Sequence, residues 1–374
     1  MNSSGFEQVE IQRRMPAHLQ IAERLRGMIK SGEMAAGSRL PTTQEFARLW
    51  NTHVPTVHLA LTILTKEGLL DRLHRKGTFV RQTGNRLSTI GVYYSSDIWA
   101  TDWKEAEYHR HVYRHLKEIL NEHKIKERVF HDVRPADEQT SPWPLLEKAV
   151  NEREIQGLLI LMMDMHQAKW LPHQPIPTIG LTGLISSRVE YDIKQFIEAG
   201  IQSLVDKGCR SLGLITPISK DDKSYKIFQR VIRKLGLETR DEWIRTSSEC
   251  VRNQEQYGYE QFRSLWSQQN RPDGVIVLPD NVAKGVITAV LQEKIRVPEE
   301  LCLVLHRNKE LEYICPFPVT FMESSCRIIA EKLWEQLQHQ LQGGQPKPLQ
   351  LNFSQVENMG VREFENAQVR KFLN

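Results

Sequence analysis

A set of basic, hydroxyl and amide side chains recurs between residues 39 and 77 of this 374-residue chain. Guanidinium and ammonium groups attract phosphate, hydroxyl groups and helix N-termini bind it, and amide groups hydrogen-bond to the edges of nucleotide bases. Together these groups are suited to double-stranded DNA, where backbone contacts position a protein and base contacts read sequence. The candidate positions with such side chains are Arg39, Thr42, Thr43, Gln44, His53, Thr56, His58, Arg75 and Lys76, and Val54 and Gly77 in the same stretch are also candidates.

The charge of the chain is unevenly distributed around these candidates. Residues 1–86 carry 13 Lys and Arg against 7 Asp and Glu, whereas the remaining residues carry 37 against 39. A basic segment is attracted to phosphate, and the release of counterions makes that attraction depend on salt. Charge alone leaves two interpretations open, a nucleic-acid contact and an ordinary solvated basic surface.

Two helices are predicted in the first part of this region. Apolar residues over 16–30 recur at helical intervals, and Pro16 suits a helix start because its missing N–H would have no partner there. Thr42, followed three residues later by Glu45, forms a capping box that opens a second helix. Because helix N-termini bind phosphate, the Thr42 and Thr43 hydroxyls stand at a favourable place for a backbone contact.

A third helix and a hairpin follow the second helix. Thr52 or His53 is placed to cap the third helix, Pro55 falls in its first turn, where the missing N–H is harmless, and Gly68 ends it. Residues 69–80, LLDRLHRKGTFV, form two short extended runs around basic residues and a glycine. This pattern predicts a two-stranded hairpin.

The segment 16–80 resembles the GntR-family winged helix-turn-helix. The landmarks are LQIAERLRGMIKSGEMAAGSRLPT, EFARLW, TVHLAL, KEGLL and KGTFV, in the family's order and spacing. The resemblance implies that the third helix lies in the major groove, with its first residues from His53 at base edges. It also implies that Arg39 contacts DNA and that Arg75 and Lys76 approach the minor groove or the backbone.

The chain departs from the family at two places where DNA-contacting arginines are frequent. Residues 53–55 are His-Val-Pro where the family usually has Ser-Arg-Thr, and Gln44 stands where Arg is common. Arg forms paired hydrogen bonds with guanine, whereas Gln prefers adenine. We therefore expect an operator sequence that differs from the family norm, with less readout of guanine.

Three residues in this segment have structural interpretations beside the functional ones. His53 serves either to cap its helix or to contact a base, and His58 is either a solvated helical residue or a DNA contact. Trp50 is interpreted as a core residue rather than a DNA-facing one.

From residue 89 onward the sequence pattern changes from helical segments to alternating strands and helices. Strand-like runs such as TIGVYY, IQGLLILMM, SLGLIT, GVIVL and LCLVLH alternate with helical segments. This alternation predicts βαβ units with parallel sheets, and two such series predict two lobes. Residues 189–209 are predicted as one long amphipathic helix. The fold class is therefore α/β behind a small helical domain.

The second part of the chain resembles the LacI/GalR effector domain. The resemblance is carried by VEYDIKQFIEAGIQSLVDKGCRSLGLI, RPDGVIVLPDNVAKGVITAVLQEKIRVPEEL and PFPVTFMESSCRIIAEKL. It implies a periplasmic-binding-protein-like domain with two Rossmann-like lobes, a ligand cleft between them and dimerisation through the same domain. A GntR reader joined to such a sensor resembles the arabinose-repressor-like regulators.

Positions after strand ends suggest ligand contacts, because open α/β sheets bind ligands at the carboxyl ends of their strands. An aromatic face would stack on a sugar ring, and a carboxylate would hold its hydroxyl groups. Arg307 replaces an acid of the family, which opens the alternative of an anionic ligand. For every candidate, a helix cap, a surface charge or core packing is the competing interpretation. The candidates are Tyr94, Ser95, Asp97, Trp99, Asp280, Arg307 and Glu323.

Other classes of function find little support in the residues. The five cysteines are scattered, without a C-x-x-C pair, which argues against a disulfide framework or a zinc site and for a reducing compartment. His111 and His115 have a spacing that could hold a metal, but a solvated helix face is the favoured interpretation. The phosphate-binding and hydrolase motifs of enzymes are absent, so we expect neither catalysis nor a cofactor.

These observations predict five segments. They are a flexible N-terminus over 1–14, a DNA-binding domain over 15–81, a linker over 82–88, a ligand-sensing and dimerisation domain over 89–360 and a tail over 361–374. The start of the chain lacks the apolar run of a secretory signal, and no stretch is long enough for a membrane helix. We expect a cytoplasmic location.

The expected function is that of a transcription regulator. As a repressor, a homodimer would bind a palindromic operator, and a small molecule, a sugar or a derivative of one, would control it from the cleft. Two alternatives remain at this point. One is a cytoplasmic small-molecule-binding protein without regulatory DNA binding, and the other is a transcription activator.

Overall fold

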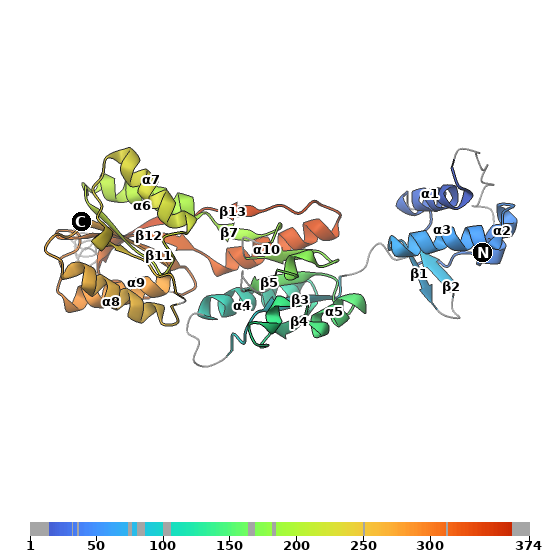
Figure 1. The fold of residues 1–374 in the computed structure, drawn as a ribbon, viewed down its shortest axis with the longest axis horizontal. Helices are drawn as coiled ribbons and strands as arrows, with labels where there is room; N and C mark the ends of the chain where they lie inside the picture. Colours follow the sequence, from blue (N-terminus) through green and yellow to red (C-terminus); the bar gives the residue numbers. More distant parts are fainter. Residues whose placement is uncertain are drawn as a thin grey trace, which may run out of the picture. The chain divides into compact units, whose positions relative to one another are not determined.

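The structure, a computed structural model, divides into two compact units, Met1–Ser88 and Thr89–Asn374. Figure 1 shows the helices and strands of each unit. The segments predicted as a flexible N-terminus and as a C-terminal tail, most of the predicted linker, and Arg75 and Lys76 lie outside the described residues. The described residues are 15–31, 33–35, 37–73, 77–80, 87–99, 106–163, 169–181, 185–249, 251–311 and 313–360.

The first unit is built around its third helix. This helix contacts the other two helices and the first strand of the hairpin (Figure 1). In its core the rings of Phe46 and Trp50 are stacked with centroids 4.5 Å apart, and Trp50 is 2% exposed. The core interpretation of Trp50 is thus confirmed. The elements are α1 (Ala17–Lys30), α2 (Thr43–Leu49), α3 (Val54–Lys66), β1 (Leu70–Leu73) and β2 (Gly77–Val80), with the two strands antiparallel.

The second unit begins with a lobe whose sheet is parallel throughout, in the order β4-β3-β5-β6. Its strands are mostly buried, as expected for a parallel sheet covered by helices. The strands are β3 (Thr89–Tyr94), β4 (Lys126–His131), β5 (Leu158–Met162) and β6 (Thr178–Gly180), and the helices are α4 (Glu107–Glu122), α5 (Pro144–Asn151) and α10 (Cys326–Leu341). The helix α10 comes from the end of the chain and contacts α4 and β6. We call this the N-lobe.

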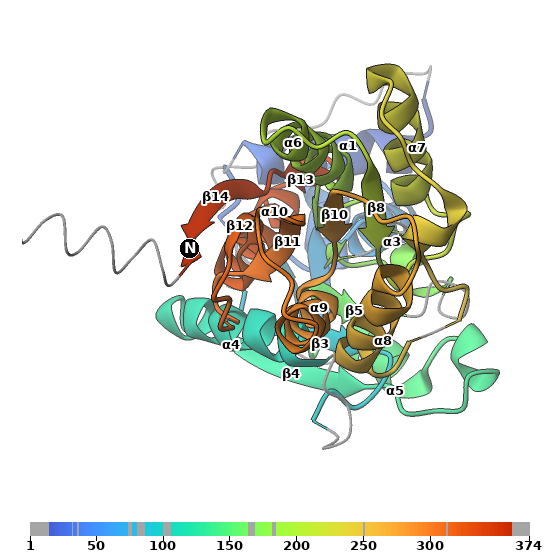
Figure 2. The same cartoon turned by 90° about the vertical axis from the view of Figure 1, so that its left-hand side faces the viewer.

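The other lobe, which we call the C-lobe, has a six-stranded sheet in the order β14-β12-β11-β10-β8-β9. Only β14 is antiparallel to its neighbour. The strands are β8 (Leu212–Ile215), β9 (Ile244–Arg245), β10 (Gly274–Val277), β11 (Cys302–Asn308), β12 (Pro318–Ser324) and β14 (Ser354–Met359), and the helices are α6 (Ile193–Asp206), α7 (Lys223–Leu235), α8 (Gln254–Trp266) and α9 (Asp280–Gln292). Figure 2 shows α6 and α7 on one face of this sheet and α8 and α9 on the other.

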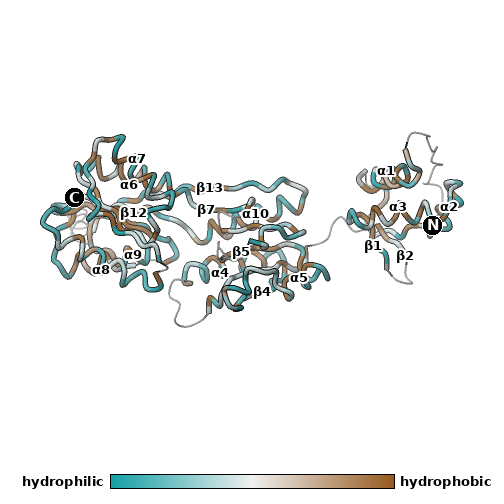
Figure 3. The backbone as a smooth tube through the Cα atoms, in the orientation of Figure 1, coloured by the Kyte–Doolittle hydropathy of each residue, from teal (hydrophilic) through white to brown (hydrophobic). Residues whose placement is uncertain are grey.

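Two apolar clusters fill the spaces between the C-lobe sheet and its helices. Phe196 and Phe228 are buried beneath α6 and α7, and Phe262 and Val282 are buried beneath α8 and α9. Figure 3 shows the same division along the backbone, with apolar strands inside and hydrophilic turns outside. This is the two-faced burial that an open α/β sheet requires.

The predicted helix over 189–209 is present but shorter than predicted, and its first residues form a strand instead. Residues Val189–Tyr191 form a strand, β7, which pairs in parallel with β13 (Leu349–Leu351), and the helix α6 begins only at Ile193. Asp192 caps that helix, since its side chain accepts hydrogen bonds from the backbone N–H groups of residues 194 and 195. The strand partner lies about 160 residues further along, so local periodicity could not indicate it.

Three segments carry the chain between the lobes (Figure 1). They follow β7, β12 and β13, and Tyr191 links them. The Ser325 N–H donates to the Tyr191 hydroxyl at 2.7 Å, and the ring of Tyr191 packs 4.8 Å from that of Phe353. Gln195 exchanges two hydrogen bonds with the backbone of Phe353. We call these linked crossovers the hinge.

Candidate functional site

The first candidate site begins at the N-terminus of α2. The Thr42 N–H donates to Glu45 Oε2 at 2.6 Å, and the Glu45 N–H donates to Thr42 Oγ1 at 3.2 Å, which completes the predicted capping box. The hydrogen bond from the Thr42 backbone is the largest cause of the lowered pKa of Glu45. Since the Thr42 hydroxyl accepts a bond here, its hydrogen remains available to a phosphate oxygen. Thr43 is half-buried and Gln44 is exposed beside it.

The N-terminus of α3 presents the side chains that were predicted to face bases. His53 is the cap residue by position, but its imidazole makes no capping hydrogen bond and is exposed. Val54, which is 44% exposed, and His58 stand one helical turn apart on the same side of α3, and Thr56 is half-buried. The His53 side chain therefore does not cap α3 in this structure.

Arg72, which is not among the predicted DNA contacts, is a further cation at this face. From β1, its Nη2 lies 3.5 Å from His58 Nδ1, and its Nη1 donates to Thr62 Oγ1 at 3.3 Å. This places a guanidinium beside the outer face of α3. In the sequence, the one indication of this role was that Arg72 lies in a short predicted strand, close to the basic residues of the hairpin.

Arg39 and Gly77 come together although 38 positions separate them. Arg39 pairs with Phe79 of β2 in an antiparallel bridge. A Cβ atom added to Gly77 would lie 2.9 Å from Arg39 Nε, and the φ angle of Gly77 is +120°. The φ angle favours glycine here, because other residues would be strained, whereas the flexible Arg39 side chain could move aside for an added Cβ atom. Arg39 thus lies across the second strand of the hairpin.

The second candidate site is a cavity of about 500 Å³ between the lobes of the second unit, which we call the inner cavity. It lies at the carboxyl ends of β5, β10, β11 and β12, which is where open α/β sheets bind ligands. Most of its wall is apolar or aromatic. Its lining residues are Tyr108, His109, Leu161, Met162, Met163, Leu181, Val189, Glu190, Tyr191, Ile193, Gln254, Pro279, Asp280, Asn281, His306, Asn308, Ser324, Ile329 and Phe353.

Four polar residues in that wall form a closed ring of hydrogen bonds. The Asp280 N–H donates to His306 Nδ1 at 3.0 Å, and His306 Nε2 lies 2.8 Å from Ser324 Oγ. Ser324 Oγ donates to Asn308 Oδ1, and Asn308 Nδ2 donates to Asp280 Oδ2 at 2.9 Å. Because His306 Nδ1 accepts a backbone hydrogen, the ring requires the neutral imidazole with its proton on Nε2.

Burial lowers the pKa of both histidines in the wall. Desolvation is the main cause for His306, and the nearby Asp280 carboxylate opposes it. Burial lowers the pKa of His109 to about 4, although a hydrogen bond to the backbone of Leu161 opposes the shift. Among the described residues, Nδ1 of His109 is buried without a hydrogen-bond partner. A bound molecule with a donor group would satisfy that nitrogen.

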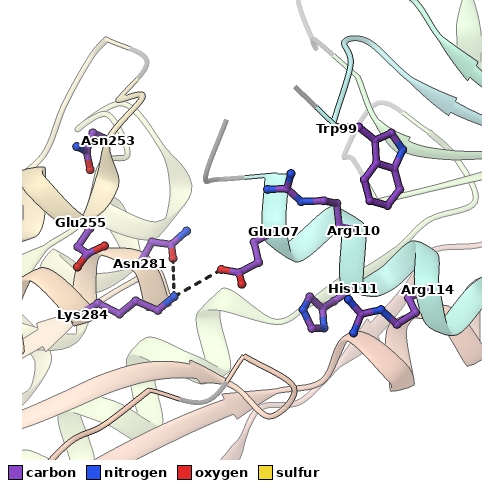
Figure 4. A pocket seen from close by; sticks show the side chains of 9 residues that line it. All are labelled: Trp99, Glu107, Arg110, His111, Arg114, Asn253, Glu255, Asn281 and Lys284. Carbon is purple, nitrogen blue, oxygen red and sulfur yellow. Dashed lines mark hydrogen bonds and ion pairs between the residues drawn. The ribbon is translucent and has the colours of Figure 1, made fainter. Parts of the chain in front are cut away.

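A second cavity of about 370 Å³, which we call the outer cavity, adjoins the first and contains most of the charge. Figure 4 shows Arg110, Arg114 and His111 extending from α4, opposite Lys284 of α9. Lys284 Nζ lies 3.7 Å from Glu107 Oε2 and donates to Asn281 Oδ1 at 3.1 Å, so an ion pair joins the lobes. The remaining lining residues are Trp99, Asn253 and Glu255.

The ligand contacts predicted at and after the end of β3 do not come together at one site in the structure. Tyr94 is fully buried and stacks on His131 with ring centroids 5.4 Å apart, so it is a core residue here. The Ser95 carbonyl accepts from Gln139, and Asp97 accepts from the Trp99 N–H at 2.8 Å. Of these four predicted residues, only Trp99, which is 51% exposed, lines one of these two cavities.

Arg307 and Glu323 lie on the opposite side of their strands from the inner cavity. They form an ion pair with each other, and the Arg307 guanidinium lies 3.8 Å from the centroid of the Phe321 ring. Strand residues alternate between faces, so their neighbours His306, Asn308 and Ser324 face the cavity instead. Asp280 is the one predicted contact that lines the inner cavity. The predicted strand ends therefore reach the inner cavity, although Arg307 and Glu323 lie on the other face of their strands.

The two histidines with metal-compatible spacing have separate environments. His111 lines the outer cavity, whereas His115 Nδ1 lies 3.2 Å from Glu118 Oε2. Within the described part of the chain, no cluster of three or more His, Cys, Asp or Glu residues could hold a metal ion.

Comparisons with known proteins address both units. Residues 17–80 match the family model for bacterial regulatory proteins of the gntR family, and residues 201–356 match that for a periplasmic binding protein-like domain. The chain joins a GntR-type helix-turn-helix domain to a periplasmic-binding-protein-like domain.

Two curated relatives match different parts of the chain. The HTH-type transcriptional repressor NagR of Bacillus subtilis (strain 168) is 42% identical over 66 residues, which are 18% of this chain and 27% of the relative. The ribose operon repressor of Escherichia coli (strain K12) is 24% identical over 179 residues, which are 45% of this chain and 53% of the relative. The chain therefore spans about half or less of the length of these relatives.

Solved structures support the fold of the periplasmic-binding-protein-like domain. A LacI family transcription regulator from Clostridium acetobutylicum superposes with a TM-score of 0.59 at 19% identity, covering 72% of this chain and 98% of the other. At that identity the likeness concerns the fold.

No helix in the described ranges is long and apolar enough to cross a membrane.

Proposed function

We propose that this chain is a DNA-binding transcription regulator that responds to a small molecule. The GntR-type domain, over residues 15–81, reads an operator through the N-terminus of α3 and contacts the DNA backbone through Arg39, Arg72 and the start of α2. The domain over 89–360 holds the ligand between its lobes and forms a homodimer. The chain itself has no catalytic role in this proposal.

The main support for the proposal is that one chain contains both a surface suited to DNA and a cavity suited to a small ligand. The exposed N-terminus of α3 is a surface for DNA, and the inner cavity, next to a hinge of three crossovers, is a surface for a small ligand. A ligand that prefers one arrangement of the lobes shifts their population toward it. The names of the relatives support repression as the sign of the response.

The expected ligand class is a sugar or a sugar derivative. Tyr108, Tyr191 and Phe353 supply aromatic surface to the cavity, while Glu190 and Asp280 supply carboxylates. Aromatic faces stack on sugar rings, and a few well-placed polar groups orient a ligand in an apolar site. The relative named for a ribose operon supports the same class. Action on operator DNA also implies a location in the cytoplasm.

Sequence selection on random duplex DNA tests the proposal. The purified full-length protein is incubated with the library at two salt concentrations, and the bound fraction is sequenced. Because a two-fold dimer reads two half-sites, we expect an inverted repeat to be enriched. Binding should weaken as salt rises, since contacts to phosphate release counterions.

Two outcomes would change the proposed function. If no DNA is bound even at low salt, the chain is a small-molecule-binding protein, which the cavity alone would support. If an inverted repeat is enriched but a reporter under its control is switched on by the protein, the chain is an activator. The same reporter, carried in cells with and without the chain, separates repression from activation.

A further inference from the structure

The outer cavity brings together cations from both lobes. Arg110 and Arg114 stand on successive turns of α4, and Lys284 faces them from α9 (Figure 4). Arg110 already donates to the carbonyl of Ile98 at 3.0 Å, so its position is held by the protein. Arg114 is exposed and makes no ion pair with a described residue. The entrance between the lobes therefore presents an exposed guanidinium, that of Arg114, beside the half-buried Arg110.

Three helices also begin at this entrance. Glu107 is the first residue of α4, Asn253 caps α8 and Asn281 is the second residue of α9, and all three line the outer cavity. A helix N-terminus carries a partial positive charge that favours an anion. In α8 and α9 some of the N–H groups are already paired, since Asn253 accepts from the Gln256 N–H and Asp280 accepts from the Asn281 N–H. The side-chain cations and the helix ends therefore act in the same direction.

The carboxylates of the outer cavity do not cancel this charge. Glu107 is held by Lys284 at 3.7 Å, and Glu255 is exposed on the first turn of α8. Among the described lining residues, three Lys and Arg side chains thus accompany two Glu side chains and His111. Burial is the main cause that lowers the pKa of His111, and the neighbouring Arg114 adds to it.

We propose that the outer cavity binds the anionic group of the effector, a phosphate monoester or a carboxylate, while the rest of that molecule occupies the inner cavity. This inference rests on the proposed function, in which the cleft is the effector site. The two cavities share Asn281, and Tyr108 and His109 of the inner wall follow Glu107 directly on α4. One molecule of modest size reaches both.

The proposal also assigns a way for the ligand to act on the lobes. The arginines belong to the N-lobe and Lys284 belongs to the C-lobe, so an anion between them contacts both. It competes with Glu107 for Lys284 and replaces one link between the lobes by another. Such an anion binds more tightly to the arrangement that brings both sets of cations together, and this difference in affinity is what shifts the population.

Isothermal titration calorimetry of the full-length protein tests this inference. The probes are inorganic phosphate and malonate, each compared with sodium chloride at the same ionic strength. We expect a saturable heat with at least one probe, and the preferred probe indicates a phosphate or a carboxylate as the natural group. The exposed Arg114→Gln variant should weaken binding about tenfold, because it removes charge-assisted hydrogen bonds.

Arg233→Gln is the matched control. Arg233 is exposed in the last turn of α7 and lines neither cavity, so this variant should bind the probe as the wild type does. Equal affinities of the wild type and Arg114→Gln, or no binding of either probe, would overturn the inference. Operator selection is measured separately. Its failure with intact anion binding would refute the regulator proposal and leave an anion-binding protein.

Discussion

Individual polar side chains in the inner cavity are arranged to satisfy one another. In the ring formed by Asp280, His306, Ser324 and Asn308, the donors and acceptors that link neighbours are matched within the protein. Such a network keeps its members in one orientation without a ligand, because breaking any link leaves a buried group unpaired. The unpaired Nδ1 of His109 is the exception, and it marks where a ligand donor would be favourable.

The titration of His109 should make stability depend on pH. Burial lowers its pKa to about 4, below the 6.5 of an unperturbed histidine, so the unfolded chain binds the proton more readily. The contribution of His109 to the free energy of unfolding is therefore fully present above pH 6.5. It decreases as the pH falls, by about 2 kcal/mol between pH 7 and pH 5. Urea unfolding followed by tryptophan fluorescence measures this change.

The His109→Gln variant isolates the contribution of this histidine. It cannot titrate and keeps a donor for the carbonyl of Leu161, so its unfolding free energy should fall by about 2 kcal/mol less than that of the wild type over the same interval. Equal losses in the two proteins would show that His109 is not the group responsible.

At the DNA-binding surface, Gln44 is predicted to limit guanine readout. A Gln44→Arg substitution supplies a guanidinium at the exposed start of α2, and Arg pairs with guanine O6 and N7. We expect the selected operator to gain a guanine at one position in each half-site. A Ser31→Arg variant adds the same charge elsewhere in the domain and should increase affinity without changing the sequence. Identical selected sequences for Gln44→Arg and the wild type would contradict the prediction.

At the scale of elements, the C-lobe wall of the cleft depends on how closely α8 and α9 approach. A Cβ atom on Gly258 would lie 2.1 Å from the Val282 carbonyl oxygen, and one on Gly285 would lie 1.9 Å from that of Glu255. Only glycine allows these helices to pack backbone against backbone. The same contact sets the positions of Asn253 and Asn281, which line the outer cavity.

A Gly285→Ala substitution should therefore separate the two helices. We expect it to lower the unfolding free energy by about 1–3 kcal/mol, because an added methyl group in a tight contact forces a backbone shift. Gly27→Ala in α1 is the control, since a Cβ atom there would have no neighbour within 4 Å, and helix propensity predicts a gain of about 0.5–1 kcal/mol. Equal effects of the two substitutions on thermal unfolding would refute this account.

At the scale of the whole molecule, a ligand signal must pass through the hinge. The three crossovers are tied together at Tyr191, whose hydroxyl accepts the Ser325 N–H. Linked crossovers favour movement of the lobes as rigid bodies over independent bending of each segment. A regulator of this design needs two lobe arrangements that the ligand and the operator bind with different affinities.

A Tyr191→Phe variant tests the hinge. It removes the acceptor of the Ser325 N–H, so we expect a loss of about 1–2 kcal/mol in unfolding free energy and a smaller effect of the ligand on operator affinity. Tyr259→Phe on α8, whose hydroxyl contacts Gln292 at the surface, is the control and should cost less than half as much. Unchanged coupling in Tyr191→Phe, measured by fluorescence anisotropy of labelled operator, would place the hinge elsewhere.

Features that depend on near neighbours along the chain could be predicted from the sequence. The capping box of α2 agrees with the prediction, and β3 spans the predicted run TIGVYY, residues 89–94. Apolar spacing and capping groups act within a few residues, so the sequence contains the information directly. Strand ends were also located correctly, which led to Asp280 as a cavity residue.

Features that depend on distant partners were decided by the tertiary structure alone. β7 exists because β13 pairs with it. Arg307 lies on the face of β11 away from the inner cavity, where it pairs with Glu323 of the neighbouring strand. The cations of the outer cavity come from helices of different lobes, so no local sequence pattern could indicate that they lie at one cavity. The sequence by itself determined most of the helices and strands and indicated a helix-turn-helix domain followed by a two-lobed domain. Only packing over long separations decided which side chains meet in the cleft, because a contact between distant residues leaves no periodicity in either segment.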